Sequence, residues 1–172
     1  MKKSNLLVSF DPAHLESAKK EIEEIFKEVK DGKIIENGKG WAEIAVKDAR
    51  DTIKKIEKIA KKDIEKLKFT IHWTPIDKWC KNSIVEMKKH LKGFVKGIKE
   101  NERWKMELKT RKLKQKPDEV KLIINLTEAI ERKNVDLDKP EKIVRVEIIG
   151  NKAGLSLLKP EEILNLNKIR EK

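Results

Sequence analysis

Residues 104–111, WKMELKTR, alternate apolar and polar or charged side chains without a break. In an extended chain successive side chains point to opposite faces, so this period of two predicts a strand with one buried face. Its charged face would carry Arg103, Lys105, Glu107, Lys109 and Arg111. Lysines alternate in the loop that follows, and Pro117-Asp118-Glu119 then begins a helix. The stretch predicts a strand, a basic loop and a helix in succession.

The sequence on both sides of this stretch continues the same kind of pattern. Upstream, residues 81–99 predict a long helix with lysines opposite an apolar stripe of Ile84, Met87, Leu91, Phe94 and Ile98. Downstream, the helix from Pro117 would turn inward Val120, Ile123, Ile124, Thr127 and Ile130. Residues 143–149 and 153–158 flank Gly150-Asn151-Lys152 as a hairpin, and a short helix follows Pro160.

The first half of the chain predicts the element order β-α-β-β-α-β. A strand over residues 5–10 leads into Asp11-Pro12, a helix-start pair, and Gly32 ends that helix. A hairpin, a helix capped by Asp48 and a strand stopped by Pro75 complete the order. This order is typical of a ferredoxin-like unit. We therefore predict an α+β protein with a ferredoxin-like domain over residues 1–74 and a second domain over residues 75–172.

Positive charge is concentrated in the middle of the chain. The net charge is +12, and residues 81–121 hold 14 Lys/Arg against 6 Asp/Glu, an excess of 8. A concentrated basic stretch inside a folded pattern is typical of a protein that binds a polyanion. A solvated basic surface is the alternative, because a protein adapted to high temperature also carries many lysines.

Several classes of protein are disfavoured. Cys80 is the single cysteine, and the histidines show no metal-ligand spacing, so we expect no disulfide framework and no metal site. Lys78 and Lys81 beside Cys80 could lower its pKa, but packing at a helix entry is the favoured role. Phosphate-binding and dinucleotide-binding glycine motifs are absent, so we expect no cofactor. Without a signal-like or membrane-spanning run, a cytoplasmic location with no membrane association is expected.

The second half resembles a known family. The motifs are WKMELKTR at 104–111, NVDLDKP at 134–140, VRVEIIG at 144–150 and AGLSLL at 153–158. Together they resemble a THUMP domain, an RNA-binding module of tRNA-modifying enzymes. The junction WTPIDKWC at 73–80 is similar to that of the stand-alone branch, in which a ferredoxin-like domain precedes THUMP without a fused enzyme.

The resemblance implies an adaptor without catalytic activity of its own. It would present tRNA, gripped at the acceptor stem and CCA end, to a separate tRNA cytidine N4-acetyltransferase that forms N4-acetylcytidine in the D-arm. Lys112 stands where the family pattern has a small polar residue, often Asn. Lysine there is compatible with phosphate binding and argues against a contact with a base edge.

The residues themselves indicate where RNA would bind. Lys109 and Arg111 share a strand face about 6–7 Å apart, close to a phosphate repeat, and the basic loop runs into a helix N-terminus that favours anions. The predicted RNA-binding set is Lys109, Arg111, Lys112, Lys114, Lys116, Arg103, Lys105 and Lys152. Trp79 is the best candidate for an exposed tryptophan, and the other three are expected in the core.

Three alternatives remain open from sequence. The chain could be a stand-alone RNA-modifying enzyme with an unrecognised site, or a general RNA-binding protein that serves another tRNA modification. It could also be a protein-interaction module whose lysines reflect thermal adaptation.

Overall fold

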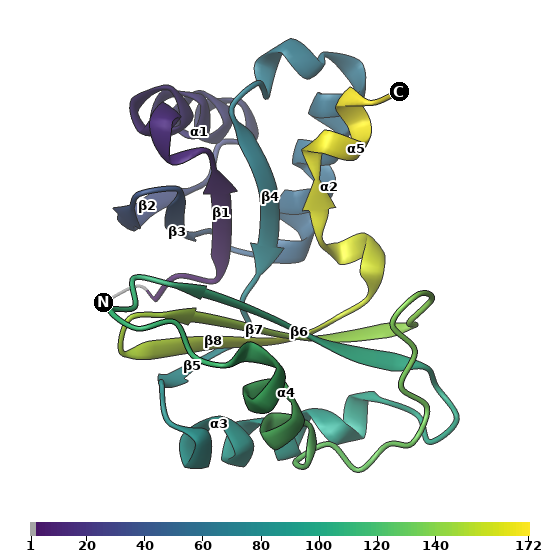
Figure 1. The fold of residues 1–172 in the computed structure, drawn as a ribbon. Coiled ribbons are helices and arrows are strands. Elements are labelled where there is room, and N and C mark those ends of the chain that lie inside the picture. Colours follow the sequence, from purple (N-terminus) through teal and green to yellow (C-terminus); the bar gives the residue numbers. More distant parts are fainter. Residues whose placement is uncertain (1–2) are drawn as a thin grey trace. The chain divides into compact units, whose positions relative to one another are not determined.

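The computed structural model describes residues 3–172, which form two units with separate sheets and cores (Figure 1). The first unit comprises the chain up to Ile76 together with Glu161–Lys172, and the second comprises Asp77–Pro160. The predicted α+β class is confirmed by these two units, each of which combines helices with its own sheet.

The first unit follows the predicted order. Its elements are β1 (Leu6–Phe10), the 3-10 turn η1 (Pro12–His14), α1 (Leu15–Val29), β2 (Lys33–Gly38), β3 (Trp41–Ala45), α2 (Ala49–Lys62), the 3-10 turn η2 (Ile64–Lys66) and β4 (Thr70–Pro75). As predicted, Asp11 and Asp48 cap helical turns, their side chains accepting hydrogen bonds from the amides of Ala13 and Asp51. The sheet is antiparallel in the order β2-β3-β1-β4-β9.

The end of the chain differs from the predicted domain boundary. After the 3-10 turn η4 (Pro160–Glu162), β9 (Leu164–Asn165) pairs with β4, and α5 (Leu166–Arg170) follows it. Leu164 and Leu166 are buried in the core of the first unit with Trp73. The sequence predicts residues 161–172 as part of the second domain, over residues 75–172. Their short apolar pattern does not specify which of two cores it joins.

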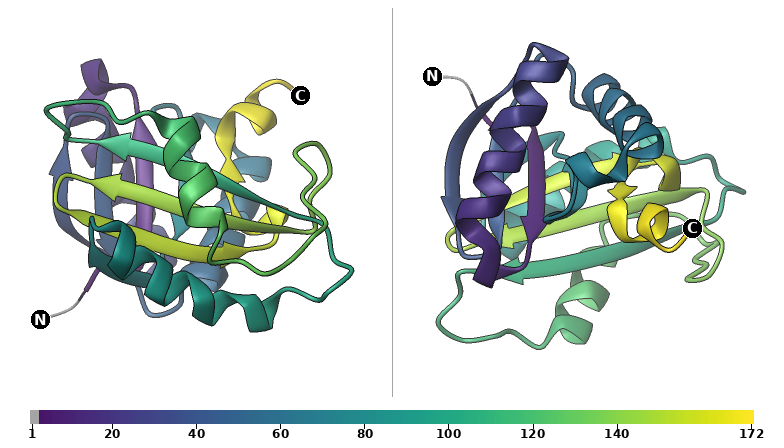
Figure 2. Two further views of the ribbon diagram at one scale, coloured as in Figure 1. Left: turned by 60° about the horizontal axis from the view of Figure 1, so that its bottom comes forward. Right: turned by 90° about the horizontal axis from the view of Figure 1, so that it is seen from above.

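The second unit contains β5 (Lys78–Lys81), α3 (Ile84–Leu91), the 3-10 turn η3 (Lys92–Gly97), β6 (Trp104–Arg111), α4 (Glu119–Thr127), β7 (Lys142–Ile149) and β8 (Lys152–Leu158). The sheet order is β5-β8-β7-β6, with β6 parallel to β7 and the other pairs antiparallel. Helices α3 and α4 cover the same face of this sheet (Figure 2, left). The alternation in residues 104–111 is confirmed: Trp104, Met106 and Leu108 are buried beneath the helices.

Both helices of the second unit depart from prediction. The long helix expected over 81–99 is the eight-residue α3 continued by η3, which contains Gly93 and Gly97. Met87, Leu91 and Ile98 are buried as predicted, but Ile84 is exposed. In α4 the predicted inward residues Val120 and Ile124 face solvent, and Leu126 is buried instead. Because α4 has apolar residues on several sides, its periodicity does not select one face.

Candidate nucleic-acid interface

The loops at one end of the second sheet lie together. The parallel strands β6 and β7 finish at the same edge, where Arg111 is paired with Ile149 and the Gly150 amide donates to the Arg111 carbonyl at 2.9 Å. The side chain and carbonyl of Lys112 come within 3.7 Å of the position that a Gly150 Cβ would occupy. The basic loop 112–118 therefore begins beside the β7–β8 hairpin, as the strand ends in Figure 1 also show.

Two helices begin at this same end. Ser83 caps α3 and Asp118 caps α4, each with its side chain accepting from a backbone amide. Lys112 has a left-handed backbone with φ of 58°, a conformation that few residues other than glycine adopt. The chain thus turns sharply as it leaves β6. This turn directs the loop toward α4 and leaves its lysine side chains exposed at the end of the sheet.

Three lysines here are available to an anion. Lys109, Lys114 and Lys116 are exposed, and none of their side chains forms a hydrogen bond or ion pair with the described part of the chain. Residues 109–121 contain 6 Lys/Arg against 2 Asp/Glu, an excess of 4. Unpaired ammonium groups at this density can release counterions and bind successive phosphates. The loop and the end of β6 form the candidate interface, defined by Lys109, Lys112, Lys114, Lys116 and Lys121.

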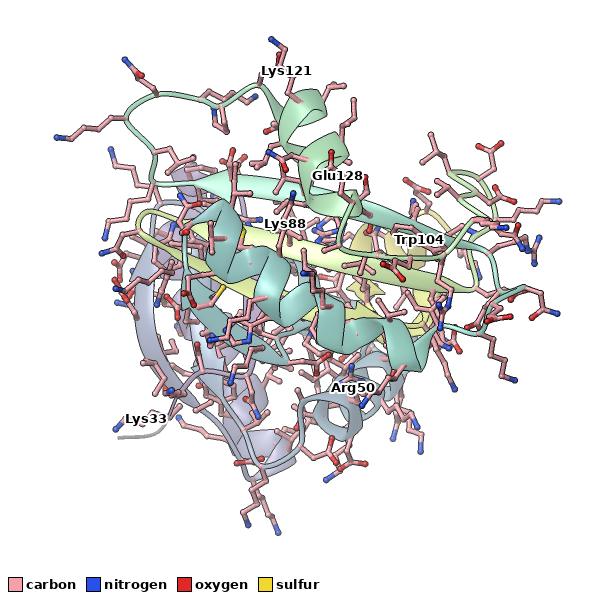
Figure 3. All side chains as sticks on the ribbon, turned by 90° about the horizontal axis from the view of Figure 1, so that it is seen from below. Lys33, Arg50, Lys88, Trp104, Lys121 and Glu128 are labelled. Carbon is pink, nitrogen blue, oxygen red and sulfur yellow. The ribbon has the colours of Figure 1, made fainter. Side chains whose placement is uncertain are left out.

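Lys121 was missed by the sequence analysis. It is exposed in the first turn of α4, and its side chain has no hydrogen bond or ion pair with residues 3–172. Its position one turn after the basic loop was the available signal. The helix brings it to the same end of the unit as the loop, and its side chain projects outward from α4 in Figure 3.

Arg111 is placed differently from the lysines. Its guanidinium forms an ion pair with Glu147, whose side chain is 1% exposed. Glu147 also accepts a hydrogen bond from Arg145 Nε at 2.8 Å. The carboxylate therefore compensates part of the charge of Arg111. Arg111 keeps further N–H groups, but its positive charge is less available to phosphate than that of Lys109.

Lys105 belongs to the same chain of ion pairs. Its Nζ lies 3.1 Å from Glu107, which in turn lies 3.0 Å from Arg145 Nη1. Burial opposes ionisation of Glu107, but Arg145 and Lys105 together hold the pKa of its carboxyl below the usual value. Burial likewise disfavours the charge of Arg145, yet Glu147 and Glu107 raise the pKa of its guanidinium. We call the set Lys105, Glu107, Arg145, Glu147 and Arg111 the ion-pair ladder.

Arg103 is not part of the interface. It precedes β6 and forms an ion pair with Glu141 at 3.0 Å, and Arg111 follows it eight positions later along the strand. At the usual rise that is about 26 Å. The predicted set is therefore divided by the structure: Lys109 and the loop lysines gather at one end, whereas Arg103 lies at the other and Lys105 between them.

Lys152 and Trp79 lie at the hairpin end of the sheet. Lys152 Nζ is 4.7 Å from the centroid of the Trp79 ring, a cation–π contact between β8 and β5. Trp79 is half-buried, and the other three tryptophans are in the cores as predicted. Cys80 packs against the second core. Burial, reinforced by Glu86, raises the pKa of its thiol and outweighs the lowering by Lys78, so the net lowering suggested from the neighbouring lysines is wrong.

Other surfaces of the described residues carry fewer features of a binding site. A groove of about 760 Å³ beside α1 is lined by lysines and glutamates, several of which pair with one another, as Lys66 does with Glu28. Residues 3–172 hold no group of three metal-ligating side chains. No helix in this part of the chain has the length and apolarity needed to cross a membrane.

The comparisons with known proteins bear on the fold. The sequence matches no protein-family model and no curated protein. Solved structures do match. PH1313 from Pyrococcus horikoshii Ot3 aligns with 91% of this chain and 55% of its own at TM-score 0.67 and 14% identity. A 4-thiouridine synthetase in complex with RNA and bound ATP aligns with 95% of this chain and 42% of its own, at TM-score 0.59 and 12% identity.

A possible methylase from Clostridium difficile 630 aligns with 90% of this chain and 41% of its own, at TM-score 0.53 and 14% identity. The chain thus spans about half, or less, of the length of these structures. They share its fold, and two of the three are named as enzymes, a synthetase and a possible methylase. This overturns the prediction that the chain is not an enzyme. That prediction rested on the absence of nucleotide-binding motifs from these 172 residues, and such an absence does not exclude a role in an enzyme.

Proposed function

We propose that this chain is the tRNA-binding part of a tRNA-modifying enzyme and holds tRNA for the catalytic step. The observation that carries the proposal is the gathering of Lys109, Lys112, Lys114 and Lys116 where β6 and β7 end. A 4-thiouridine synthetase of the same fold was solved with RNA. That likeness supports RNA as the polyanion, and the sequence resemblance to THUMP domains supports tRNA, gripped at its acceptor stem and CCA end.

The reaction that we propose is the formation of N4-acetylcytidine in the D-arm by a tRNA cytidine N4-acetyltransferase. It rests on the resemblance of residues 73–80 and 104–158 to the THUMP branch that serves this reaction. Methylation is a second candidate, because a possible methylase shares the fold. Mass spectrometry of tRNA nucleosides from a strain lacking the gene separates the two. Selective loss of N4-acetylcytidine supports the first candidate, and selective loss of a methylated nucleoside supports the second.

Binding of tRNA is tested by replacing Lys109, Lys112, Lys114 and Lys116 with glutamine. Each phosphate contact contributes to the salt dependence, with log affinity falling by about 0.9 per contact in duplex regions for each unit of log salt. We expect the magnitude of that slope to be smaller by roughly two to four in the variant. We also expect its affinity for tRNA at moderate salt to fall at least about tenfold. Fluorescence anisotropy with labelled tRNA over a salt series measures both.

The matched control removes the same kind of charge from another surface. Lys54, Lys58 and Lys62 are exposed along α2 in the first unit. Their replacement by glutamine is expected to change the slope by less than one. A slope near zero for the unchanged protein, or equal losses in the two variants, would contradict an RNA interface at the loop.

A further inference from the structure

Two lysines of the chain share an unusual backbone conformation. Lys30 and Lys112 each have φ of 58°, and among residues 3–172 they are the two with positive φ that are not glycine. In this left-handed region the Cβ atom is crowded by the backbone, a strain that glycine avoids because it has no Cβ. A lysine is therefore held there only where the surrounding structure fixes its backbone.

The conformation of Lys30 follows from the end of a helix. Lys30 comes directly after α1, and its backbone N–H donates to the Phe26 carbonyl. Many helices end in a left-handed residue, because this conformation closes the last turn with such a hydrogen bond. Lys112 has no comparable explanation, since it follows the strand β6.

Contacts on both sides of Lys112 fix its backbone. Before it, the Arg111 carbonyl accepts a hydrogen bond from the Gly150 amide at 2.9 Å. After it, Leu113 packs against the second core. The Cδ atom and the carbonyl oxygen of Lys112 lie 3.7 Å from the position that a Gly150 Cβ would occupy, which is an ordinary contact distance. The aliphatic part of the lysine therefore lies beside the β7–β8 hairpin, where the chain leaves the sheet.

The next lysines of the loop are held less firmly. Lys114 and Lys116 are exposed, and within residues 3–172 neither forms a hydrogen bond through its backbone or its side chain. Each would lose backbone and side-chain freedom on binding a phosphate, and this loss opposes binding. The backbone of Lys112 has already lost its freedom in folding. Its ammonium group can therefore bind a phosphate at a smaller entropic cost.

From this difference we propose that Lys112 is the anchoring phosphate-binding residue of the candidate interface. Its left-handed backbone is retained, at a cost in stability, because it fixes the side chain at the end of the sheet. This inference rests on the proposed binding of tRNA by the same interface. Glycine at this position would keep the turn with less strain but would have no ammonium group. The residue that best stabilises the turn therefore differs from the residue that best binds RNA.

Glycine and alanine variants measure the strain. Lys112→Gly and Lys112→Ala both remove the ammonium group, but only alanine keeps the crowded Cβ. In urea denaturation the equilibrium constant for unfolding should be about two- to tenfold smaller for the glycine variant than for the alanine variant. Lys30→Gly and Lys30→Ala are the matched control pair, since Lys30 has the same φ and is also exposed. A similar difference is expected between them.

The affinity for labelled tRNA, measured by fluorescence anisotropy over a salt series, tests the anchoring. Lys112→Gly should bind about five- to tenfold more weakly at moderate salt, and the magnitude of its salt slope should be smaller by about one. A purely structural role would leave that slope unchanged. Lys114→Gln and Lys116→Gln should each lose less than about threefold in affinity. Lys30→Gly should bind like the unchanged protein, and Lys112→Arg should keep most of the affinity.

The outcomes distinguish this inference from the proposed function. If the variant with four glutamines loses affinity while Lys112→Gly binds like the unchanged protein, tRNA binding stands and the anchoring role is overturned. Equal losses from Lys112→Gly, Lys114→Gln and Lys116→Gln would overturn it as well. Equal stabilities of Lys112→Gly and Lys112→Ala would show that the turn carries no strain. If the variant with four glutamines also binds like the unchanged protein, the proposed function itself is wrong.

Discussion

Glu147 is the buried centre of the ion-pair ladder. It is 1% exposed and is held between Arg145 and Arg111, and Arg145 also reaches Glu107. Removing a carboxylate from water costs several kcal/mol, which two hydrogen-bonded guanidinium groups can offset. Most of the charged side chains predicted on one face of β6 therefore form ion pairs within β6 or with β7 and stabilise the sheet. Lys109 is the member of that face that remains exposed and unpaired in residues 3–172.

Replacing Arg145 with alanine should be costly. The side chain is 8% exposed, and its loss would leave Glu147 buried with only Arg111 to compensate it. We expect the free energy of unfolding to fall by about 3–5 kcal/mol. Arg103→Ala is the matched control, because its pair with Glu141 is 45% exposed on both sides and is worth about 0–1 kcal/mol. Urea denaturation at neutral pH measures both. Similar losses would show that the ladder has no special stabilising role.

Among the elements, strands were easier to predict than helices. WKMELKTR alternates without a break, so its strand and its buried face could both be read from the sequence. The Asp11-Pro12 and Asp48 helix starts were equally plain, because capping depends on neighbouring residues alone. In α4 the apolar residues Val120, Leu122, Ile123, Ile124 and Leu126 surround the helix. Which of them is buried depends on the sheet beneath, which the local sequence does not describe.

The orientation of α4 can be checked with two alanine variants. Leu126 is fully buried in the second core, so Leu126→Ala should leave a cavity and cost about 2–5 kcal/mol. Ile124 is only two residues away but lies on the opposite, exposed side of the helix, so Ile124→Ala should stay within about 0.5 kcal/mol. Urea denaturation compares the two variants. The reverse order of losses would support the orientation first predicted from periodicity.

At the scale of the molecule, the sequence predicted an α+β protein of two domains and a basic stretch over residues 81–121. It did not predict which charged side chains are paired, because the pairs Arg111–Glu147 and Arg145–Glu107 depend on the register of β6 against β7. Lys109 is level with Glu147 in that register, yet Glu147 binds the two arginines. Such long-range pairings are fixed by the folded sheet and leave no local signal.

The return of the chain end to the first unit is the last feature that the sequence left undetermined. Leu166 is fully buried there, next to β9 and its partner β4. Leu166→Ala should cost the first unit about 2–5 kcal/mol by leaving a cavity. Hydrogen exchange measured by mass spectrometry resolves the unit affected, because local opening reports local stability. We expect faster exchange in peptides from β1 and β4 and little change in β6 and β7. Faster exchange confined to β6 and β7 would instead place residues 161–172 with the second unit, as the boundary at residue 75 had assigned them.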